Sequence, residues 1–433
     1  MIDKVREIAL KVLYDVDKNL AYSNIALDEA LNQARKNREQ INSRDIGFIS
    51  EIVYGTISWK LTLDEIIKKY SNIKIKKISP WILNILRMSI YQIVFLDKVP
   101  KSAAVNEGVN LAKRYGHKSS SNFVNAILRK VEKKDYEEFF KIENDIEKIS
   151  KTTSMPIWII EELLRENTIE KVEKICRVSN LKPKVSIRIN TLKTNIDDFI
   201  KKMQEKNIEI EKGDTDNFLF IEGIKNIESH KEFQEGLFTV QDEAAGLIPT
   251  ILNPQPGEKV LDACSSPGGK TTYIAELMND EGFIKAWDIH EHRVKLVDEA
   301  AKRLGIDIIE TEVKDATKYE DKYFEYFDKI LLDVPCLGIG VLKRKPDIKW
   351  QRKREDIEEI SKIQKEILEN CSKYLKLNGE LVYSTCSILY KENEGIIQEF
   401  LKSNKNFKII EKNQIYQNEK TDGFFICKLQ KMQ

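Results

Sequence analysis

The chain has few of the residues that build disulfide frameworks or metal sites. Its 433 residues include six cysteines and four histidines, and the cysteines form no Cys-x-x-Cys pair or other metal-ligand spacing. Disulfide-rich domains are small and dense in cysteine, and structural zinc sites need closely spaced ligands. We therefore predict neither a disulfide framework nor a bound metal.

Long apolar stretches are also missing. No uninterrupted run approaches the roughly 20 residues of a membrane-spanning helix, and residues 1–8 have the pattern of an amphipathic helix rather than of a signal peptide. With 41% hydrophobic and 33% charged residues, the composition fits a soluble globular protein. We predict a cytoplasmic monomer with no membrane partner.

Two nucleotide-binding signatures are incomplete. The phosphate-binding P-loop needs a glycine where Cys264 stands, and the dinucleotide pattern G-x-G-x-x-G does not occur. What is present is Asp262-Ala-Cys-Ser-Ser-Pro-Gly-Gly-Lys270, between an apolar run at 260–261 and a helix-like stretch at 271–278. A tight strand-to-helix turn gathers backbone N–H groups and the positive end of the helix dipole, so it can bind a polar ligand. Such a turn can also be purely structural.

Charge is unevenly distributed along the chain. The net charge is +1, but residues 1–135 contain 24 Lys and Arg against 15 Asp and Glu, and the remainder contains 47 against 55. The N-terminal part therefore carries about +9 and the rest about −8. This asymmetry favours an anionic partner such as nucleic acid, although a solvated lysine-rich surface would give the same count.

Residues 1–135 have apolar positions at helical spacing, for example at 8–14, 46–57 and 81–91. Ser79-Pro80 places a capping residue before a proline at the first helical position. This pattern predicts an all-α bundle. The charged stretch 130–151 predicts a helical linker. Residues 150–245 mix helix-like and strand-like segments and predict a small α/β module.

Residues 246–433 have the pattern of a Rossmann-like domain. Candidate strands at 260–263, 283–288, 308–311, 329–333 and 380–384, with helices between them, predict a doubly wound parallel sheet. Residues 407–412 and 423–429 predict an antiparallel hairpin at the sheet edge. Ligands of such sheets bind at the carboxyl ends of the strands.

Two aspartates follow candidate strands. Asp288 ends the second strand, 19 residues after Gly269, where it can accept hydrogen bonds from a ribose diol. Asp315 follows the third strand and can hold the exocyclic amine of an adenine. Either aspartate alone is commonly a helix cap or turn residue. Together with the glycine turn they indicate an adenosine pocket without the dinucleotide signature, which S-adenosylmethionine fits best.

Two cysteines also follow strands. The fourth strand ends in Asp333-Val-Pro-Cys-Leu-Gly-Ile-Gly340 and the fifth in Tyr383-Ser-Thr-Cys-Ser387. A single cysteine is usually a small core residue, but a pair at neighbouring strand ends favours chemistry. Attack of a thiolate on C6 of cytosine produces an enamine whose C5 can take a methyl group, which divides one difficult step into two. Asp333 can hydrogen-bond the N3 edge as charge develops on the ring.

These three stretches resemble the RNA (cytosine-5) methyltransferase family. Residues 102–115 and 122–130 resemble the closing helices of a NusB-like antitermination-factor domain, which implies RNA binding and narrows the resemblance to the ribosomal RNA small subunit methyltransferase B branch. The resemblance covers essentially the full chain. It implies methyl transfer from S-adenosylmethionine to C5 of a cytosine in 16S ribosomal RNA, free or at early assembly, with RNA binding also by residues 150–245.

The resemblance also implies residue roles. In the family the Thr-Cys cysteine attacks and the Pro-Cys cysteine releases the product, which gives these roles to Cys386 and Cys336; the chemistry of the residues alone does not choose between them. The implied cofactor contacts are Cys264, Ser265, Ser266, Pro267, Gly268, Gly269, Lys270, Asp288, Asp315 and Asp333. Arg293, in the following helix, is expected to steady the same side of the pocket. The family commonly has two small alanines at the two serine positions, so we expect no loss of function.

Some features leave alternatives open. Residues 341–350 combine basic groups with Trp350 and predict either a segment that follows RNA phosphates and stacks a base, or a solvated loop. Cys176, Cys371 and Cys427 are predicted to be core residues. Alternative functions are a transfer-RNA (cytosine-5) methyltransferase and a non-catalytic RNA-binding or antitermination factor.

Overall fold

The computed structural model describes residues 3–37, 41–206, 208–223 and 227–433. The described chain packs into two compact units. The first comprises Met1–Leu181 and Leu342–Lys353, and the second comprises Lys182–Val341 and Arg354–Gln433. The chain therefore leaves the second unit after Val341 and returns to it at Arg354. The domain limits expected from the sequence, at 135, 150 and 245, stay predictions.

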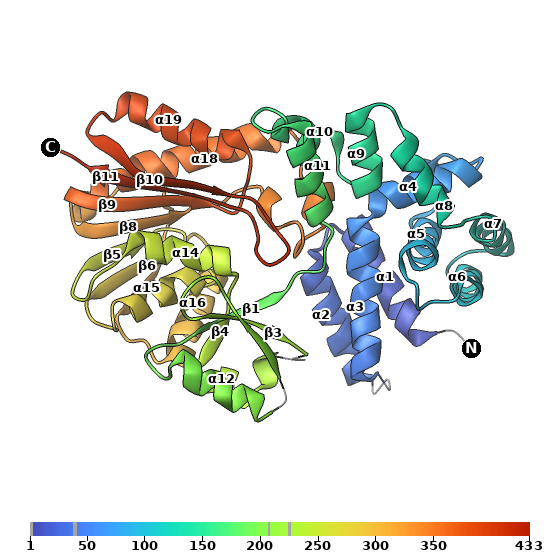
Figure 1. Cartoon of the computed structure of the whole chain (residues 1–433), viewed down its shortest axis with the longest axis horizontal. Coiled ribbons are helices and arrows are strands. Elements are labelled where there is room, and N and C mark those ends of the chain that lie inside the picture. The colour runs from blue at the N-terminus through green and yellow to red at the C-terminus, as the bar shows by residue number, and fades with distance from the viewer. Residues whose placement is uncertain (1–2, 38–40, 207, 224–226) are drawn as a thin grey trace. The chain divides into compact units, whose positions relative to one another are not determined.

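The first unit is helical, as the sequence predicts (Figure 1). Helix α5 is its centre, because every side chain from Ile82 to Val94 is buried. Ser79 and Pro80 occupy the predicted N-cap and first helical positions, although the Ser79 side chain makes no capping bond. The helices are α1 (Lys4–Lys18), α2 (Ser23–Lys36), α3 (Ser43–Ser58), α4 (Lys60–Tyr70), η1 (Ile75–Lys77), α5 (Pro80–Phe95), α6 (Lys101–Tyr115), α7 (Lys118–Leu128), α8 (Lys134–Glu137), η2 (Glu138–Lys141), α9 (Asp145–Thr153), α10 (Ile157–Leu163) and α11 (Ile169–Val178). Within the described ranges, no helix of either unit combines the length and apolar character needed to cross a membrane.

The charged stretch 130–151 is largely helical, as its composition predicts, but it is part of the first unit and not a linker. It folds into α8, η2 and the start of α9, and it packs against the bundle. The Tyr136 ring lies edge-on to Trp59 and Phe95, and the buried Asp135 carboxylate accepts hydrogen bonds from Lys69 and Tyr70. Buried Val131 and partly buried Phe139 pack on the same core, so a few apolar contacts and a paired carboxylate hold a charge-rich segment in the bundle.

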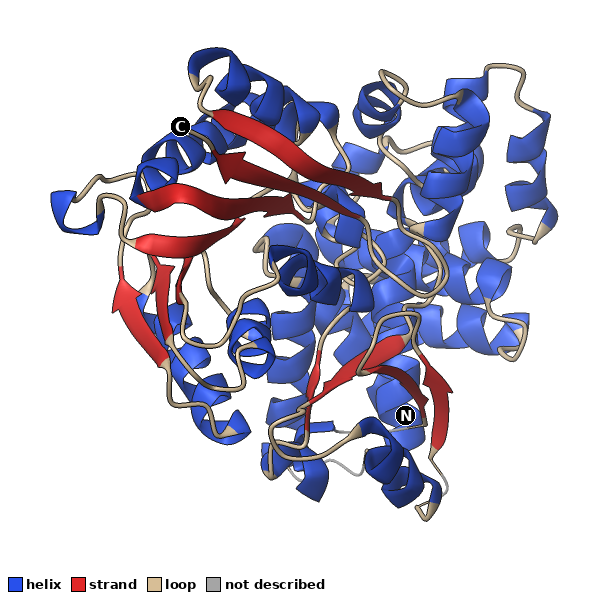
Figure 2. Cartoon of the chain, turned by 60° about the vertical axis from the view of Figure 1, so that its left-hand side comes forward, coloured by secondary structure: helices blue, strands red, loops and turns tan. Residues whose placement is uncertain are grey.

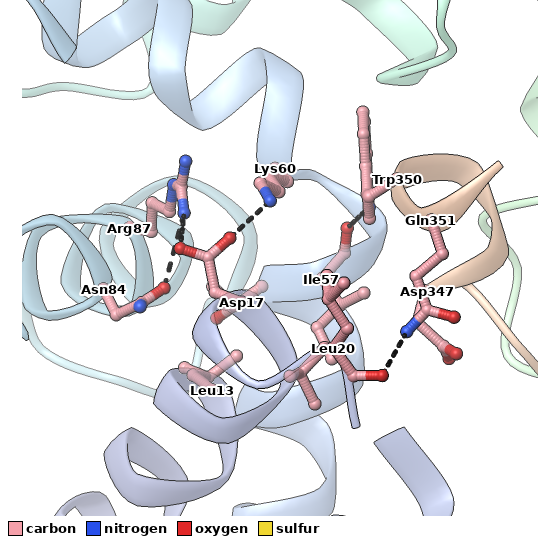
Figure 3. Close-up of a pocket in the computed structure, with 12 residues that line it drawn as sticks. Leu13, Asp17, Leu20, Ile57, Lys60, Asn84, Arg87, Asp347, Trp350 and Gln351 are labelled. Carbon is pink, nitrogen blue, oxygen red and sulfur yellow. Dashed lines mark hydrogen bonds and ion pairs between the residues drawn. The ribbon is translucent and has the colours of Figure 1, made fainter. Parts of the chain in front are cut away.

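Leu342–Lys353 also belongs to the first unit, where it contributes α17 (Ile348–Gln351). Figure 3 shows Trp350, whose indole N–H donates to the carbonyl of Ile57 at 2.7 Å. The Lys349 ammonium is buried and donates to the Ser58 carbonyl at 2.7 Å and to Asn180 at 2.9 Å. Neither sequence-based expectation holds for these two residues: their side chains are packing elements of the first unit and are not free to follow RNA.

A small cavity of about 50 Å³ lies beside this segment (Figure 3). The buried Arg87 guanidinium pairs with Asp17 at 3.2 Å on the cavity wall. It also pairs with Asp64 at 2.7 Å. Asp347 enters the same wall from the inserted segment and accepts a hydrogen bond from Ser23. A cavity of this size holds at most a few waters, so its ion pairs serve the packing of the unit.

The second unit begins with a small antiparallel sheet. Among the described residues its strand order is β2-β3-β1-β4. The elements are β1 (Val185–Ile189), α12 (Ile196–Gln204), β2 (Glu209–Lys212), β3 (Phe218–Glu222), η3 (Ile227–Ser229), α13 (Lys231–Gln234) and β4 (Phe238–Val240). Phe199 and Met203 of α12 pack against Ile187 and Ile189 of β1 to form its core. This is the small α/β module that the sequence predicts.

The larger sheet of the second unit is the predicted doubly wound sheet (Figure 2). In the described part of the chain its order is β10-β11-β9-β8-β5-β6-β7, and the five strands from β9 to β7 are parallel. The predicted hairpin pairs antiparallel at the other edge. The strands are β5 (Lys259–Asp262), β6 (Phe283–Asp288), β7 (Ile309–Val313), β8 (Phe327–Asp333), β9 (Leu375–Thr385), β10 (Phe407–Ile415) and β11 (Phe424–Lys431).

Helices cover both faces of this sheet (Figure 1). Along β8, Ile330 and Leu332 contact the core under α18 and α19, whereas Leu331 contacts the core under α14, α15 and α16. Side chains of a strand alternate between faces, so a run of apolar residues is the expected pattern for a strand buried on both. The helices are α14 (Glu243–Leu252), α15 (Gly269–Leu277), α16 (Glu291–Leu304), α18 (Asp356–Cys371) and α19 (Glu394–Ser403); the short turns are η4 (Asp321–Tyr323), η5 (Ile339–Val341), η6 (Ser372–Tyr374) and η7 (Tyr390–Glu392).

The prediction that three cysteines are core residues is confirmed. Cys176, Cys371 and Cys427 are all buried. Burial raises the pKa of Cys176 to about 12, so this thiol keeps its proton. These cysteines serve as small apolar residues.

Trp350→Ala should destabilise the first unit, because it removes a packed ring and the indole hydrogen bond to the Ile57 carbonyl. We expect a loss of about 2–4 kcal/mol, seen as a lower unfolding temperature by calorimetry of the full chain. Lys345→Ala, an exposed position of the same segment, is the control and should leave the transition in place. Equal transitions in both variants would show that the segment does not stabilise the unit.

Candidate active site

The predicted site residues follow the carboxyl ends of neighbouring parallel strands. Asp262, Asp288 and Asp333 are the last residues of β5, β6 and β8, and Cys386 comes directly after β9. The pairing register sets Asp333 opposite Ser384 on β9. Parallel strands in register end at the same edge of a sheet, which is where ligands of open α/β sheets bind.

The turn after β5 is tied to the end of β6. The Ser265 amide and hydroxyl both donate to the Trp287 carbonyl, at 2.8 and 2.9 Å. Gly268 has φ +99 and precedes α15, and a Cβ there would lie 3.1 Å from Val297 Cα. This position therefore needs glycine for its backbone conformation. As the N-cap it also leaves the first turn of α15 without a side-chain cap.

Seven of the predicted site residues line one cavity: Cys264, Ser265, Ser266, Pro267, Gly269, Lys270 and Asp333. The same cavity is lined by Asp262 and by Val240, Gln241 and Ala245 from the chain before the large sheet. Gly268, Asp288, Arg293, Asp315 and the two cysteines are not among its lining residues. The structure thus places the glycine turn and the end of β8 together.

Asp262 is a buried acid of this cavity that the sequence-based list of site residues omits. Its Oδ2 accepts a hydrogen bond from the Thr271 hydroxyl at 2.7 Å, and its Oδ1 has no partner among the described residues. Burial raises the pKa of Asp262 to about 7; the charge of Asp333 adds to this effect and the Thr271 hydrogen bond opposes it. The turn motif signals the position, but its burial depends on packing that the motif does not reveal.

Lys270 and Asp333 form an ion pair across the cavity. Lys270 Nζ lies 2.6 Å from Asp333 Oδ2, and the Ser384 hydroxyl donates to Asp333 Oδ1 at 2.9 Å. Burial lowers the pKa of Lys270, but the neighbouring Asp333 carboxylate outweighs it and holds that pKa above its usual value. The pair therefore sets one positive and one negative group at the strand ends.

The two candidate catalytic cysteines are in contact. Their Sγ atoms lie 2.9 Å apart, Cys336 in the loop after β8 and Cys386 after β9. The hydrogen bond with Cys386 and burial raise the pKa of Cys336 well above its usual range, and the nearby Glu392 and Asp333 carboxylates add to this effect. Cys336 therefore keeps its proton at neutral pH.

The remaining predicted cofactor residues differ in their surroundings. Asp288 is buried and accepts a hydrogen bond from the His290 amide at 3.0 Å. Asp315 accepts two bonds from Thr317, at 2.9 and 2.7 Å; burial raises its pKa, but these bonds outweigh it and the net pKa is lowered. Arg293 lies on the exposed side of α16.

Arg188 is a further residue that the sequence did not reveal. It is fully buried on β1, and its guanidinium donates to the Gly269 carbonyl at 2.7 Å, to the Thr272 hydroxyl at 3.1 Å and to both carboxylate oxygens of Glu276, at 2.7 and 3.0 Å. A paired arginine fixes geometry through its planar fork of donors. The small sheet thereby holds the first turns of α15, which carry the glycine turn.

Relatives of known family cover nearly the whole chain. The protein called probable ribosomal RNA small subunit methyltransferase B of Bacillus subtilis is 37% identical, over 99% of this chain and 98% of its own length. The protein of the same name from Synechocystis sp. is 36% identical, over 93% of this chain and 90% of its own length. The chain belongs to the ribosomal RNA small subunit methyltransferase B family.

Separate family descriptions match three parts of this methyltransferase. Residues 3–133 match the NusB family, residues 155–227 the RsmF/B-like ferredoxin-like domain, and residues 249–430 the 16S rRNA methyltransferase RsmB/F. The crystal structure of the protein PH0851 superposes with a TM-score of 0.81 at 28% identity, covering 100% of both chains. A methyltransferase homologue from Pyrococcus horikoshii covers 67% of this chain and 100% of its own, with a TM-score of 0.59 and 27% identity. The predicted family and fold are confirmed.

Asp262→Asn should change how the stability of this methyltransferase depends on pH. With a pKa of about 7 folded and about 3.9 unfolded, Asp262 holds a proton only in the folded state between these values. Its contribution to the free energy of unfolding is therefore complete below pH 4 and falls by about 1.4 kcal/mol per pH unit as pH rises to 7. Denaturant unfolding at pH 5 and pH 7.5 should show a smaller difference in Asp262→Asn. Identical differences in both proteins would contradict the assignment.

Proposed function

We propose that this methyltransferase transfers a methyl group from S-adenosylmethionine to C5 of a cytosine in 16S ribosomal RNA, through a covalent adduct with Cys386. The observation that carries the proposal is the pair of thiols, 2.9 Å apart, beside the Asp333–Lys270 ion pair. C5 of cytosine becomes nucleophilic when a thiolate adds to C6, and a second thiol at the same place can assist the reverse elimination. The names of the relatives support ribosomal RNA as the substrate class.

The division of roles follows the family resemblance, in which the Thr-Cys cysteine attacks and the Pro-Cys cysteine takes part in release. A nucleophilic cysteine has to be a thiolate, and the raised pKa of Cys336 indicates that the two sulfurs in contact do not both ionise at neutral pH. After methyl transfer, a base has to take the C5 proton while the C5–C6 double bond forms again and the bond from C6 to the Cys386 sulfur breaks. Attack by Cys386 removes the hydrogen bond that is the largest cause of the raised pKa of Cys336, so Cys336 can then give its proton to solvent and act as that base in its thiolate form. Cys386 attacks, and Cys336 takes part in release.

The cavity residues fit S-adenosylmethionine, which supplies a methyl group on a positively charged sulfur. The orphaned Oδ1 of Asp262 is a buried acceptor, and the uncapped first turn of α15 offers backbone N–H groups. Asp262 and Asp333 provide acidic groups in the same cavity. Asp288 is assigned to the ribose and Asp315 to the adenine amine. Cys264, Ser265, Ser266, Pro267 and Gly268 shape the turn, and Arg293 steadies its outer side.

Asp333 is also assigned to the base. The proton that Cys386 loses on attack can pass through the Asp333 carboxyl group to N3, where it neutralises the negative charge that moves onto the ring after attack at C6. The NusB-like part, with about nine excess positive charges in residues 1–135, supports binding of RNA through phosphates. The small sheet contributes further RNA contact, and the substrate is free RNA or an early assembly particle.

The two cysteines should fail in different ways when each is changed to alanine. Cys386→Ala removes the nucleophile, so neither methylation nor an adduct should form. Cys336→Ala leaves attack possible but slows release, so a protein–RNA adduct should accumulate. The measurement is a denaturing gel of enzyme, cofactor and 16S ribosomal RNA transcript, with methylation followed by bisulfite sequencing.

Cys176→Ala, at a buried cysteine of the first unit, is the matched control and should behave like the unchanged enzyme. The reverse pattern of adducts would exchange the roles of the cysteines. Methylation in both variants without any adduct would remove the covalent mechanism. Methylation of transfer RNA but not of the 16S transcript would show that the substrate is transfer RNA and not 16S ribosomal RNA.

Asp288→Ala should weaken S-adenosylmethionine binding at least about tenfold, because hydrogen bonds to a carboxylate contribute about 1.5–3 kcal/mol each. Calorimetric titration of the full chain measures this directly. Asp298→Ala, on the outer face of α16, serves as the control because its carboxylate accepts a bond from Thr311 instead. Unchanged affinity in Asp288→Ala would remove this residue from the cofactor site.

A further inference from the structure

Glu392 is a buried carboxylate close to the two cysteines. It is the last residue of η7 and has no exposed surface. Its backbone is held by the Tyr383 hydroxyl, which donates to the Glu392 carbonyl at 2.7 Å from strand β9. A buried carboxyl group is stable only when other groups hydrogen-bond to it. The Glu392 side chain therefore ties together the chain segments that supply its hydrogen-bond donors.

The donors come from the loops that carry the cysteines. Glu392 Oε2 accepts a hydrogen bond from the amide of Leu337 at 2.8 Å, and Oε1 accepts one from the hydroxyl of Ser387. Leu337 directly follows Cys336, and Ser387 directly follows Cys386. One carboxylate thus binds the residue after each cysteine.

Two further side chains extend this arrangement. Gln364 of α18 donates to Glu392 Oε2 at 3.2 Å and to the Pro335 carbonyl at 2.9 Å, so it bonds the residue before Cys336. Asn393 accepts from the Thr385 hydroxyl at 2.5 Å and donates to the Ser387 carbonyl at 3.0 Å. Both cysteines are therefore flanked on each side by residues bonded to this cluster.

We propose that Glu392 is a positioning residue that holds the two cysteine loops in the register that brings their thiols into contact. This inference rests on the proposed function for its catalytic consequence, but the thiol contact itself does not. Glu392 cannot touch RNA, since it has no exposed surface. Its effect has to pass through Leu337 and Ser387.

Backbone contacts also restrict how far the two cysteine loops can shift relative to each other. The Gly340 amide donates to the Cys386 carbonyl at 2.9 Å, and the Gly340 carbonyl accepts from Gly423 at 2.8 Å. A Cβ on Gly340 would lie 2.1 Å from the Gly423 oxygen and 2.8 Å from the Cys386 oxygen. Glu392 fixes the near end of the Cys336 loop, and this close backbone approach fixes its far end.

Glu392→Ala should lower kcat for methylation of 16S transcript at least about tenfold, because displacing reacting groups by an ångström has effects of this size. KM for RNA and for cofactor should stay within about threefold. Glu392→Gln keeps an acceptor for Leu337 and can donate to Ser387, so it should restore most of kcat. Ser387→Ala, which removes only the Cys386 side, should give an intermediate loss.

A second readout does not depend on methylation. Contact with Cys386 is the largest cause of the raised pKa of Cys336, so separation of the thiols should make Cys336 more acidic. Iodoacetamide labelling of the full chain over pH 7–10, quantified for each cysteine by mass spectrometry, should show Cys336 reacting at lower pH in Glu392→Ala than in Glu392→Gln, which loses the same charge but can keep the hydrogen bonds to both loops. Glu394→Ala is the matched control, because that carboxylate pairs with Lys412 and Gln398.

Three results would overturn the inference: an unchanged kcat in Glu392→Ala, the same labelling profile of Cys336 in Glu392→Ala and Glu392→Gln, or equal losses of kcat in these two variants together with a rise in KM. If Glu392→Ala does not fold, Ser387→Ala and Glu392→Gln decide, and unchanged kcat in Ser387→Ala rejects the positioning role. If the unchanged enzyme methylates nothing, the proposed function fails, and the labelling profile still decides whether Glu392 holds the thiols together.

Discussion

The site depends on the parallel register of β5, β6, β8 and β9. Neighbouring parallel strands run in the same direction, so their carboxyl ends lie along one edge of the sheet, and residues more than one hundred positions apart in the sequence meet there. Asp262, Asp288, Asp333 and Cys386 are all placed by this constraint. Two buried side chains then hold the loops that follow the strands. Arg188 donates to the carbonyl of Gly269 in the glycine turn, and Glu392 binds the residue after each cysteine.

Several groups at the strand ends also have pKa values that differ from their ordinary ones. A buried acid with a raised pKa, a lysine kept charged by its carboxylate partner, and a thiol that shares its proton lie close together. Each of these shifts follows from burial combined with a specific neighbour. A cationic ligand in the cavity would act on all of them at once, so ligand binding and thiol ionisation are expected to be linked.

Much of this arrangement was predictable because it is local in sequence. The strands, the edge hairpin, and the residues that follow each strand are visible as apolar runs that end in polar motifs. The residues that were missed act over long separations: Arg188 reaches Glu276, 88 positions away, and Glu392 reaches Leu337, 55 positions away. Composition was misleading at 130–151, where Val131, Tyr136 and Phe139 pack on the bundle core and a buried, paired acid adds to them despite the surrounding charge.

The inserted segment Leu342–Lys353 has a consequence for the order of synthesis. Residues up to Leu181 of the first unit leave the ribosome early, but Trp350 and Lys349 complete its packing only after most of the large sheet has been made. At about 5–20 residues per second, the intervening chain takes roughly 10 to 30 seconds to synthesise. During synthesis the helical unit therefore stays incompletely packed until residues 342–353 have been made. Because these residues follow β8 and the Cys336 loop in the sequence, the helical unit can complete its packing only after both have been synthesised.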